Sequence, residues 1–184
     1  PARTSRLVSD KEREITAYHE AGHALVAASL KDADPVSKVS IVARGQAGGY
    51  TLNLPLEDRR LKTRSQFLAD LAMMMGGYAA EKIVFNDITT GASSDLKKAS
   101  DLSRNLVTRF GMSEKLGPLA FGKSTEMIFL GRDMITEKEY SEEVAAEIDT
   151  EIKKFINDAH KKAFAIIKAN RGALKAIADA LIEK

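Results

Sequence analysis

Residues 9–30 read SDKEREITAYHEAGHALVAASL, and this stretch has the periodicity of a helix. Ser9 or Asp10 is suited to the N-cap position, and acidic side chains follow in the opening turns. Apolar side chains then recur at spacings of three and four residues: Ile15, Tyr18, Ala21, Leu25 and Ala28. We therefore predict a helix over 9–30 with an apolar face against the core.

Two histidines lie in this predicted helix, in the segment His19-Glu20-Ala21-Gly22-His23, which has the pattern H-E-x-x-H. Residues four apart lie on one helix face, so both imidazoles can bind one ion. Glu20 projects about 100° further around the helix, within reach of a metal-bound water. The pattern predicts zinc on His19 and His23, with Glu20 as the base that activates water against a peptide bond. The alternative is a surface helix with two unconnected histidines.

A catalytic zinc site needs a third protein ligand. The chain has no cysteine, and the pattern around the remaining histidine, His160, is typical of a surface or interhelical residue. A carboxylate is therefore expected, and two candidates stand out. Glu81 lies on a second predicted helix, and Asp95 opens a third, where the helix dipole also favours an acidic residue. The residue pattern leaves both candidates open.

The remaining patterns predict a mainly α (α+β) fold with a small sheet. Val36–Ala43 and Tyr50–Leu54 alternate apolar and polar residues around a glycine-rich turn, so they are expected to pair as a hairpin. Gly76-Gly77 predicts either a close helix contact or a helix break. Ser93 or Ser94 is suited to cap the third helix. Further helices are expected over 62–85, 93–110, 140–170 and 173–184, with an irregular segment over 111–136.

Composition narrows the class of protein. The 184 residues, 44% hydrophobic and 29% charged, suffice for one domain with a core. A net charge of +2, with no basic run carrying aromatics, argues against nucleic-acid binding. The absence of cysteine excludes disulfides and thiolate ligands. No apolar run approaches the roughly 18 residues of a membrane span, so we expect a soluble chain without membrane contact of its own.

The abrupt ends of the sequence suggest a domain excised from a longer protein. We expect a single domain over 1–184, with a catalytic part over about 9–135 and C-terminal helices over about 137–184. The C-terminal helices have a broad apolar stripe, which either packs on the domain or contributes to an interface between subunits.

Several longer blocks occur in one order along nearly the whole chain: Gly49-Tyr50-Thr51, GGYAAE at 76–81, TGASSDL at 90–96, GMSEKLGPL at 111–119 and FLGR at 129–132. With the H-E-x-x-H segment, these blocks resemble the peptidase domain of the FtsH-type zinc metalloproteases, which are membrane-anchored, ATP-dependent AAA proteins. Two departures are Tyr78, where the family usually has arginine, and the loop at 46–48.

The resemblance implies that Asp95, in the T-G-A-x-x-D block, is the third ligand of one Zn²⁺ per chain. Glu81 would then contact a ligand residue without binding the metal itself. It also implies a homo-hexameric ring that hydrolyses unfolded or membrane-protein polypeptides in protein quality control. The parent protein would be anchored in the inner or plasma membrane, with this domain on the cytoplasmic side. ATP would bind a preceding AAA module, because this chain has no G-x-x-x-x-G-K-[ST] phosphate loop.

Gly48, Gly49, Tyr50 and Thr51 are expected to form an edge strand to which substrate adds as a further strand. The alternative is a plain hairpin packed on the core. Two other functions stay open at this point. One is a free-standing metallopeptidase with Glu81 as third ligand, and the other is a non-catalytic ring-assembly module of the same fold.

Overall fold

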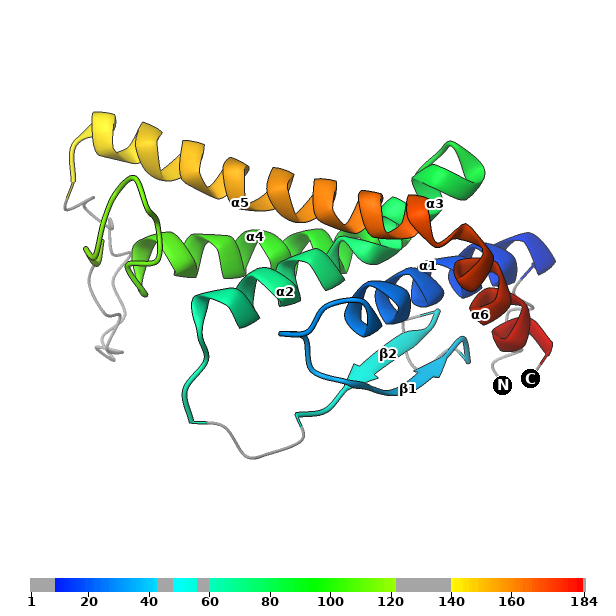
Figure 1. The fold of residues 1–184 in the computed structure, drawn as a ribbon. Coiled ribbons are helices and arrows are strands. Elements are labelled where there is room, and N and C mark those ends of the chain that lie inside the picture. The colour runs from blue at the N-terminus through cyan, green and yellow to red at the C-terminus, as the bar shows by residue number, and fades with distance from the viewer. Residues whose placement is uncertain (1–8, 43–47, 56–59, 122–139, 184) are drawn as a thin grey trace, which may run out of the picture.

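The computed structural model describes residues 9–42, 48–55, 60–121 and 140–183. The predicted mainly helical fold with a small sheet is confirmed (Figure 1). Sequence patterns at 43–47 and 122–139, including part of the predicted irregular segment, lie outside the described residues. The described elements are, in order, α1 (Asp10–Ala28), β1 (Val36–Ser40), β2 (Tyr50–Asn53), α2 (Arg64–Met74), α3 (Gly76–Phe85), the short 3₁₀ turn η1 (Thr90–Ala92), α4 (Ser93–Thr108), α5 (Glu142–Ala169) and α6 (Arg171–Glu183).

Helix α1 is the central element, and it begins as the sequence predicts. The Ser9 hydroxyl accepts from the Glu12 amide, while the Glu12 carboxylate accepts from the Ser9 amide, which makes a capping box. Every residue from Ala17 to Ala27 is buried, whereas the periodicity predicted one apolar face. The difference arises because α1 is surrounded: α3 and α6 pack on it, and the hairpin lies against it (Figure 1).

The predicted hairpin is confirmed as a two-stranded antiparallel sheet. Val39 pairs with Thr51 and Ser40 pairs with Tyr50, and the register shifts once between Val36 and Lys38. Strand β1 ends at Ser40 rather than Ala43. Because side chains alternate between the two faces of a strand, this register determines which residues of β2 face α1.

At Gly76-Gly77 the sequence left a close contact and a helix break as alternatives, and both occur. Helix α2 ends at Met74 and α3 begins at Gly76. The backbones of α1 and α3 meet there, because a Cβ on Gly22 would overlap the Gly76 carbonyl and lie 2.8 Å from the Ala80 Cβ. Two glycines in register thus let the helices approach more closely than side chains would permit.

The C-terminal helices share the buried core with the rest of the described chain. Helix α5 runs across α2, α3 and α4, and α6 lies along α1 (Figure 1). Buried residues from both, such as Phe155, Ile167 and Leu174, belong to one cluster with α1 and α3. The predicted serine cap of α4 is wrong: Ala92 holds the N-cap position without a side-chain bond, because η1 runs directly into the helix.

The helix crossing gives a stability prediction. Replacing Gly22 by alanine is expected to lower the free energy of unfolding by about 1–3 kcal/mol. The new methyl group would overlap the backbone of Gly76, which cannot move aside without separating the two helices. The measurement is urea unfolding of the metal-free protein.

The matched control is Gly172→Ala in α6, where an added Cβ meets nothing within 4 Å. That variant is expected to be neutral or up to about 1 kcal/mol more stable, as alanine favours a helix. Equal stability of the Gly22 variant and the wild type would contradict the close crossing.

Candidate metal centre

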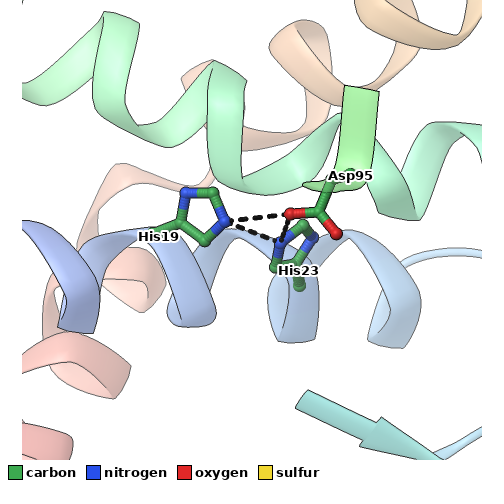
Figure 2. Close-up of side chains that lie close together, drawn as sticks. All are labelled: His19, His23 and Asp95. Atoms are coloured by element: carbon green, nitrogen blue, oxygen red, sulfur yellow. Dashed lines mark hydrogen bonds and ion pairs between the residues drawn. The ribbon is translucent and has the colours of Figure 1, made fainter. Parts of the chain in front are cut away.

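The side chains of His19, His23 and Asp95 converge on one point (Figure 2). Two of them come from consecutive turns of α1 and the third from the first turn of α4. Asp95 Oδ2 lies 3.2 Å from Nε2 of each histidine, and the two Nε2 atoms are 3.0 Å apart. The side chains are 10%, 9% and 19% exposed, so the cluster is largely shielded from water.

This donor set fits the zinc ion that the sequence predicts. For bonds of about 2.0–2.1 Å in tetrahedral geometry, neighbouring ligand atoms are about 3.3 Å apart. The observed separations of 3.0–3.2 Å are close to that value. Two imidazoles and one carboxylate, with a fourth position left open, are typical of catalytic zinc sites.

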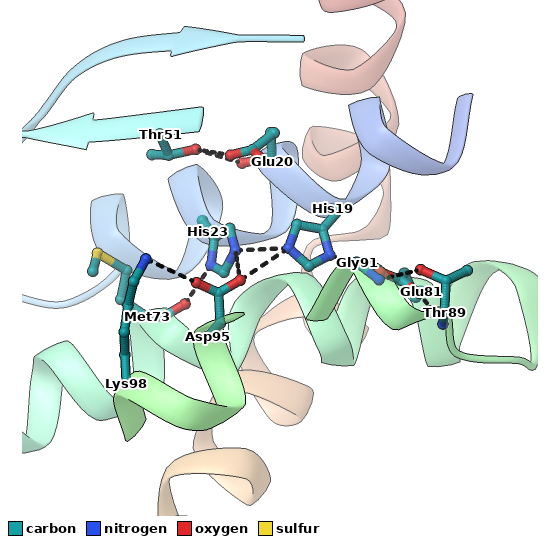
Figure 3. A network of polar contacts seen from close by, with 10 residues as sticks. All are labelled: His19, Glu20, His23, Thr51, Met73, Glu81, Thr89, Gly91, Asp95 and Lys98. Atoms are coloured by element: carbon teal, nitrogen blue, oxygen red, sulfur yellow. Dashed lines mark hydrogen bonds and ion pairs between the residues drawn. The ribbon is translucent and has the colours of Figure 1, made fainter. Parts of the chain in front are cut away.

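The outer nitrogen of each histidine ring has a hydrogen-bond acceptor of its own. His19 Nδ1 donates to Glu81 Oε1 at 2.7 Å, and His23 Nδ1 donates to the Met73 carbonyl oxygen at 2.8 Å (Figure 3). Neither acceptor can donate, so in the neutral rings the lone pairs lie on Nε2 and face Asp95. Such partners hold the ring orientation that metal binding needs.

The Met73 carbonyl lies in the last turn of α2, next to the helix break, where carbonyl oxygens have fewer partners than inside a helix. It accepts from the Met75 amide at the C-cap and, through its second lone pair, from His23 Nδ1. The Gly76-Gly77 break thus supplies an acceptor for His23, and a Cβ on Gly77 would overlap the His19 ring. The glycine pair marks the helix break in the sequence, but no residue pattern indicates the Met73 carbonyl as an acceptor.

Electrostatics show that the metal-free site attracts a cation. Burial alone would lower the pKa of His19, but hydrogen bonds to Asp95 and Glu81 and the charge of Glu20 raise it to about 9. Burial likewise opposes ionisation of Asp95 and Glu81, yet their histidine partners hold the pKa of each carboxyl below its usual range. Two ionised carboxylates therefore surround the histidines, and a proton or a metal ion compensates them.

Glu20 lies outside the three-residue cluster, on the β2 side of α1 (Figure 3). Its side chain is buried, and its Oε2 accepts from the Thr51 hydroxyl at 2.7 Å. The structure places this carboxylate one residue from a histidine of the cluster but outside the three ligand residues, and its role as a proton carrier stays a prediction.

The two candidates for a third ligand occupy different places. Asp95 faces both Nε2 atoms, whereas Glu81 is bound to Nδ1 of His19 and, through Oε2, to the Thr89 amide at 2.7 Å. Of the predicted substrate residues, Gly48 and Gly49 precede β2, and Tyr50 and Thr51 lie in it. His160 is interhelical: it packs against Tyr78 and Phe164, and it is not among the three residues of the cluster.

Comparison with known proteins shows the family of the chain. The sequence profile of Peptidase family M41 matches residues 6–184. The chain belongs to peptidase family M41. Its relatives include the ATP-dependent zinc metalloproteases FtsH of Caldicellulosiruptor bescii (50% identical over 184 residues) and Rubrobacter xylanophilus (51% over 183), and FtsH 1 of Sphaerobacter thermophilus (53% over 183).

Each alignment covers 100% of this chain but only 28–30% of the relative, so the M41 chain spans less than a third of these proteins. The resemblance to FtsH-type peptidase domains that the sequence blocks predict is confirmed. None of the helices in the described part of the M41 chain combines the length and hydropathy that a membrane crossing needs.

The different positions of the two carboxylates in the M41 site predict different losses of zinc affinity. Glu81→Gln removes a partner of His19 and is expected to weaken zinc binding by about 10- to 100-fold. Asp95→Asn removes the ionised group that faces both Nε2 atoms and should weaken it by a larger factor. Competition with a chelating dye measures both, and the opposite order would mean that Glu81 is the ligand.

The raised pKa of His19 predicts how zinc affinity depends on pH. Below about pH 9 the metal-free ring carries a proton that a bound ion must displace. Apparent affinity should therefore rise about tenfold per pH unit and level off only near pH 9. Chelator competition between pH 6 and 10 measures this slope. If the apparent zinc affinity levels off near pH 6.5, the ordinary pKa of histidine, the carboxylates do not raise the pKa of His19.

Proposed function

We propose that the chain is a zinc-dependent endopeptidase domain that hydrolyses peptide bonds of polypeptide substrates. The observation that carries this proposal is the convergence of His19 Nε2, His23 Nε2 and Asp95 Oδ2, with Glu20 beside them and outside the cluster. An arrangement of three ligands, an open position and a neighbouring free carboxylate is the one that metallopeptidases use.

His19, His23 and Asp95 would hold the ion, and Glu81 and the Met73 carbonyl would fix the two rings. Zinc bound there would acidify a coordinated water and polarise the carbonyl of the scissile bond. Glu20 would take the proton from the attacking water and return it to the leaving amine. The role of Glu20 requires a carboxylate that no ligand bond occupies, which agrees with its separation from the cluster.

The position of substrate is part of the same proposal. In the described part of the sheet, β2 pairs with β1, and no further strand of the described residues pairs with its other edge. A substrate segment adding to that edge would bind through main-chain hydrogen bonds with little sequence preference. Gly48, Gly49 and Tyr50 would contribute backbone contacts there, and this edge lies on the Glu20 side of α1 (Figure 3).

The relatives are named ATP-dependent zinc metalloproteases, and they are more than three times as long as this chain. We therefore extend the proposal to the parent protein. It would be a membrane-anchored, homo-hexameric protease with ATP bound in a separate AAA module and this domain on the cytoplasmic side. Residues 1–184 would act as one peptidase domain, to which the C-terminal helices belong.

Two other functions have less support. A free-standing metallopeptidase with Glu81 as third ligand is disfavoured, because Glu81 is bound to Nδ1 of His19 and to the Thr89 amide. A non-catalytic ring-assembly module would need neither the three converging donors nor a buried carboxylate at Glu20. Catalysis by the wild type and its loss on substitution of Glu20 separate these functions.

The test is the substitution Glu20→Gln, which keeps the size of the side chain and removes its basicity. Hydrolysis of casein and of an internally quenched, unstructured peptide should fall by about 10²- to 10⁴-fold, the range for loss of a general base. Zinc content, measured by atomic absorption, should stay at one ion per chain.

The control is Glu14→Gln, an exposed residue on the same helix, which should leave the rate unchanged. Full activity of the Glu20 variant with zinc still bound would refute the proposed mechanism.

A further inference from the structure

The side chain of Thr51 contacts Glu20, although the sequence assigns Thr51 to a strand that binds substrate. Its hydroxyl donates to Glu20 Oε2 at 2.7 Å and lies 3.3 Å from the Glu20 carbonyl oxygen (Figure 3). Both neighbours are acceptors, so the hydroxyl proton is directed at Glu20. A hydroxyl engaged in this way cannot also donate its proton to a substrate side chain.

The strand register determines this contact. Thr51 pairs with Val39 and Ser40 pairs with Tyr50, which turns Thr51 towards α1, while the next residue, Leu52, is 41% exposed. A slip of one residue would exchange the two faces and remove the hydroxyl from Glu20. The contact is therefore a property of the folded hairpin.

Gly49 restricts the same carboxylate from a second direction. A Cβ built on Gly49 would lie 2.9 Å from both Cγ and Oε1 of Glu20, and 2.9 Å from the Ser40 carbonyl oxygen. The chain before β2 therefore lies directly against the Glu20 side chain, which is only 6% exposed. A glutamate has several rotatable bonds, so an unrestricted Glu20 would spend much of its time away from a reactive position.

We propose that Thr51 is a positioning residue for Glu20, which it holds by a hydrogen bond to Oε2 in the space that Gly49 leaves open. This inference rests on the proposed function, since it assumes that Glu20 acts on the attacking water. It changes the predicted role of the strand: the backbone edge of β2 serves substrate, and the Thr51 side chain serves the base. Orientation of a reacting group contributes to rate without contributing to substrate affinity.

The test compares two substitutions in the zinc-loaded protein at its full natural length. Thr51→Val keeps the shape of the side chain and its suitability for a strand but removes the hydroxyl. Thr51→Ser keeps the hydroxyl and removes a methyl group. The matched control is Thr150→Val, an exposed threonine of α5 whose hydroxyl bonds only to its own helix, at Ala146. The readouts are kcat and KM on a quenched unstructured peptide, zinc content and the melting temperature.

We expect Thr51→Val to lower kcat by about 10- to 100-fold, as when the partner of an oriented active-site group is removed. KM should stay within about twofold of the wild-type value, because binding of the substrate before reaction is not affected. Thr51→Ser should recover most of the rate, zinc should remain at one ion per chain, and Thr150→Val should behave as wild type.

Four results would overturn the inference. These are an unchanged kcat in Thr51→Val, a loss expressed only in KM, a loss of zinc, or an equal loss of kcat in the serine variant. A KM effect would indicate a substrate contact, and loss of zinc would indicate support of the metal site. An equal loss in both variants would indicate packing by the methyl group.

The Glu20→Gln variant, assayed in parallel, separates this inference from the function on which it rests. If Glu20→Gln is inactive while Thr51→Val is fully active, the positioning role fails and the proposed function stands. If Glu20→Gln is fully active with zinc bound, the proposed function itself fails.

Discussion

The close crossing of α1 and α3 at Gly22 and Gly76 is the contact on which the rest of the site depends. With no side chain at either glycine, the two backbones meet, and the segment of α1 that carries both histidines lies against the α2–α3 junction. That junction supplies the Met73 carbonyl to His23, and α3 supplies Glu81 to His19. A wider helix separation would remove both acceptors together, and with them the ring orientations.

Helix α3 also connects to the segment that carries Asp95, the third side chain of the cluster. Glu81 bonds with one oxygen to His19 and with the other to the amide of Thr89. Thr89 is the N-cap of η1, which runs directly into α4 and so places Asp95 in its first turn. One buried carboxylate therefore connects the helix that carries the histidines to the segment that carries the aspartate. The charges follow from this arrangement, because two carboxylates held against His19 raise its pKa and make a cation favourable.

Much of this fold could be predicted from sequence because its elements have strong local signals. The N-cap signal at Ser9 or Asp10, the alternation in both strands and the long periodic run in α5 all correspond to observed elements. The α4 cap could not be predicted, since a preceding 3₁₀ turn leaves no serine side chain at its N-cap. Full burial of α1 could not be predicted either, because it depends on how many elements surround the helix. The spacing of apolar residues indicates only one buried face.

For the site, helical spacing alone brings His19 and His23 together, so that pair could be predicted from the residues. The choice between Asp95 and Glu81 could not, because it depends on tertiary placement, and only the family resemblance favoured Asp95. The bonds from His23 to the Met73 carbonyl and from Thr51 to Glu20 were missed for a related reason. A backbone carbonyl is present at every residue, so residue type does not reveal which one accepts from His23. Threonine is common in strands, so its presence at position 51 does not indicate a bond to Glu20.

Two imidazoles and one aspartate are expected to share a single zinc ion, while Glu20 stays free of it. Anomalous diffraction at the zinc absorption edge, from crystals of the zinc-loaded protein, locates the ion. We expect one peak at bonding distance, about 2.0–2.2 Å, from His19 Nε2, His23 Nε2 and an Asp95 oxygen. A peak bonded to Glu81 or Glu20 in place of Asp95, or no peak between the two rings, would contradict it.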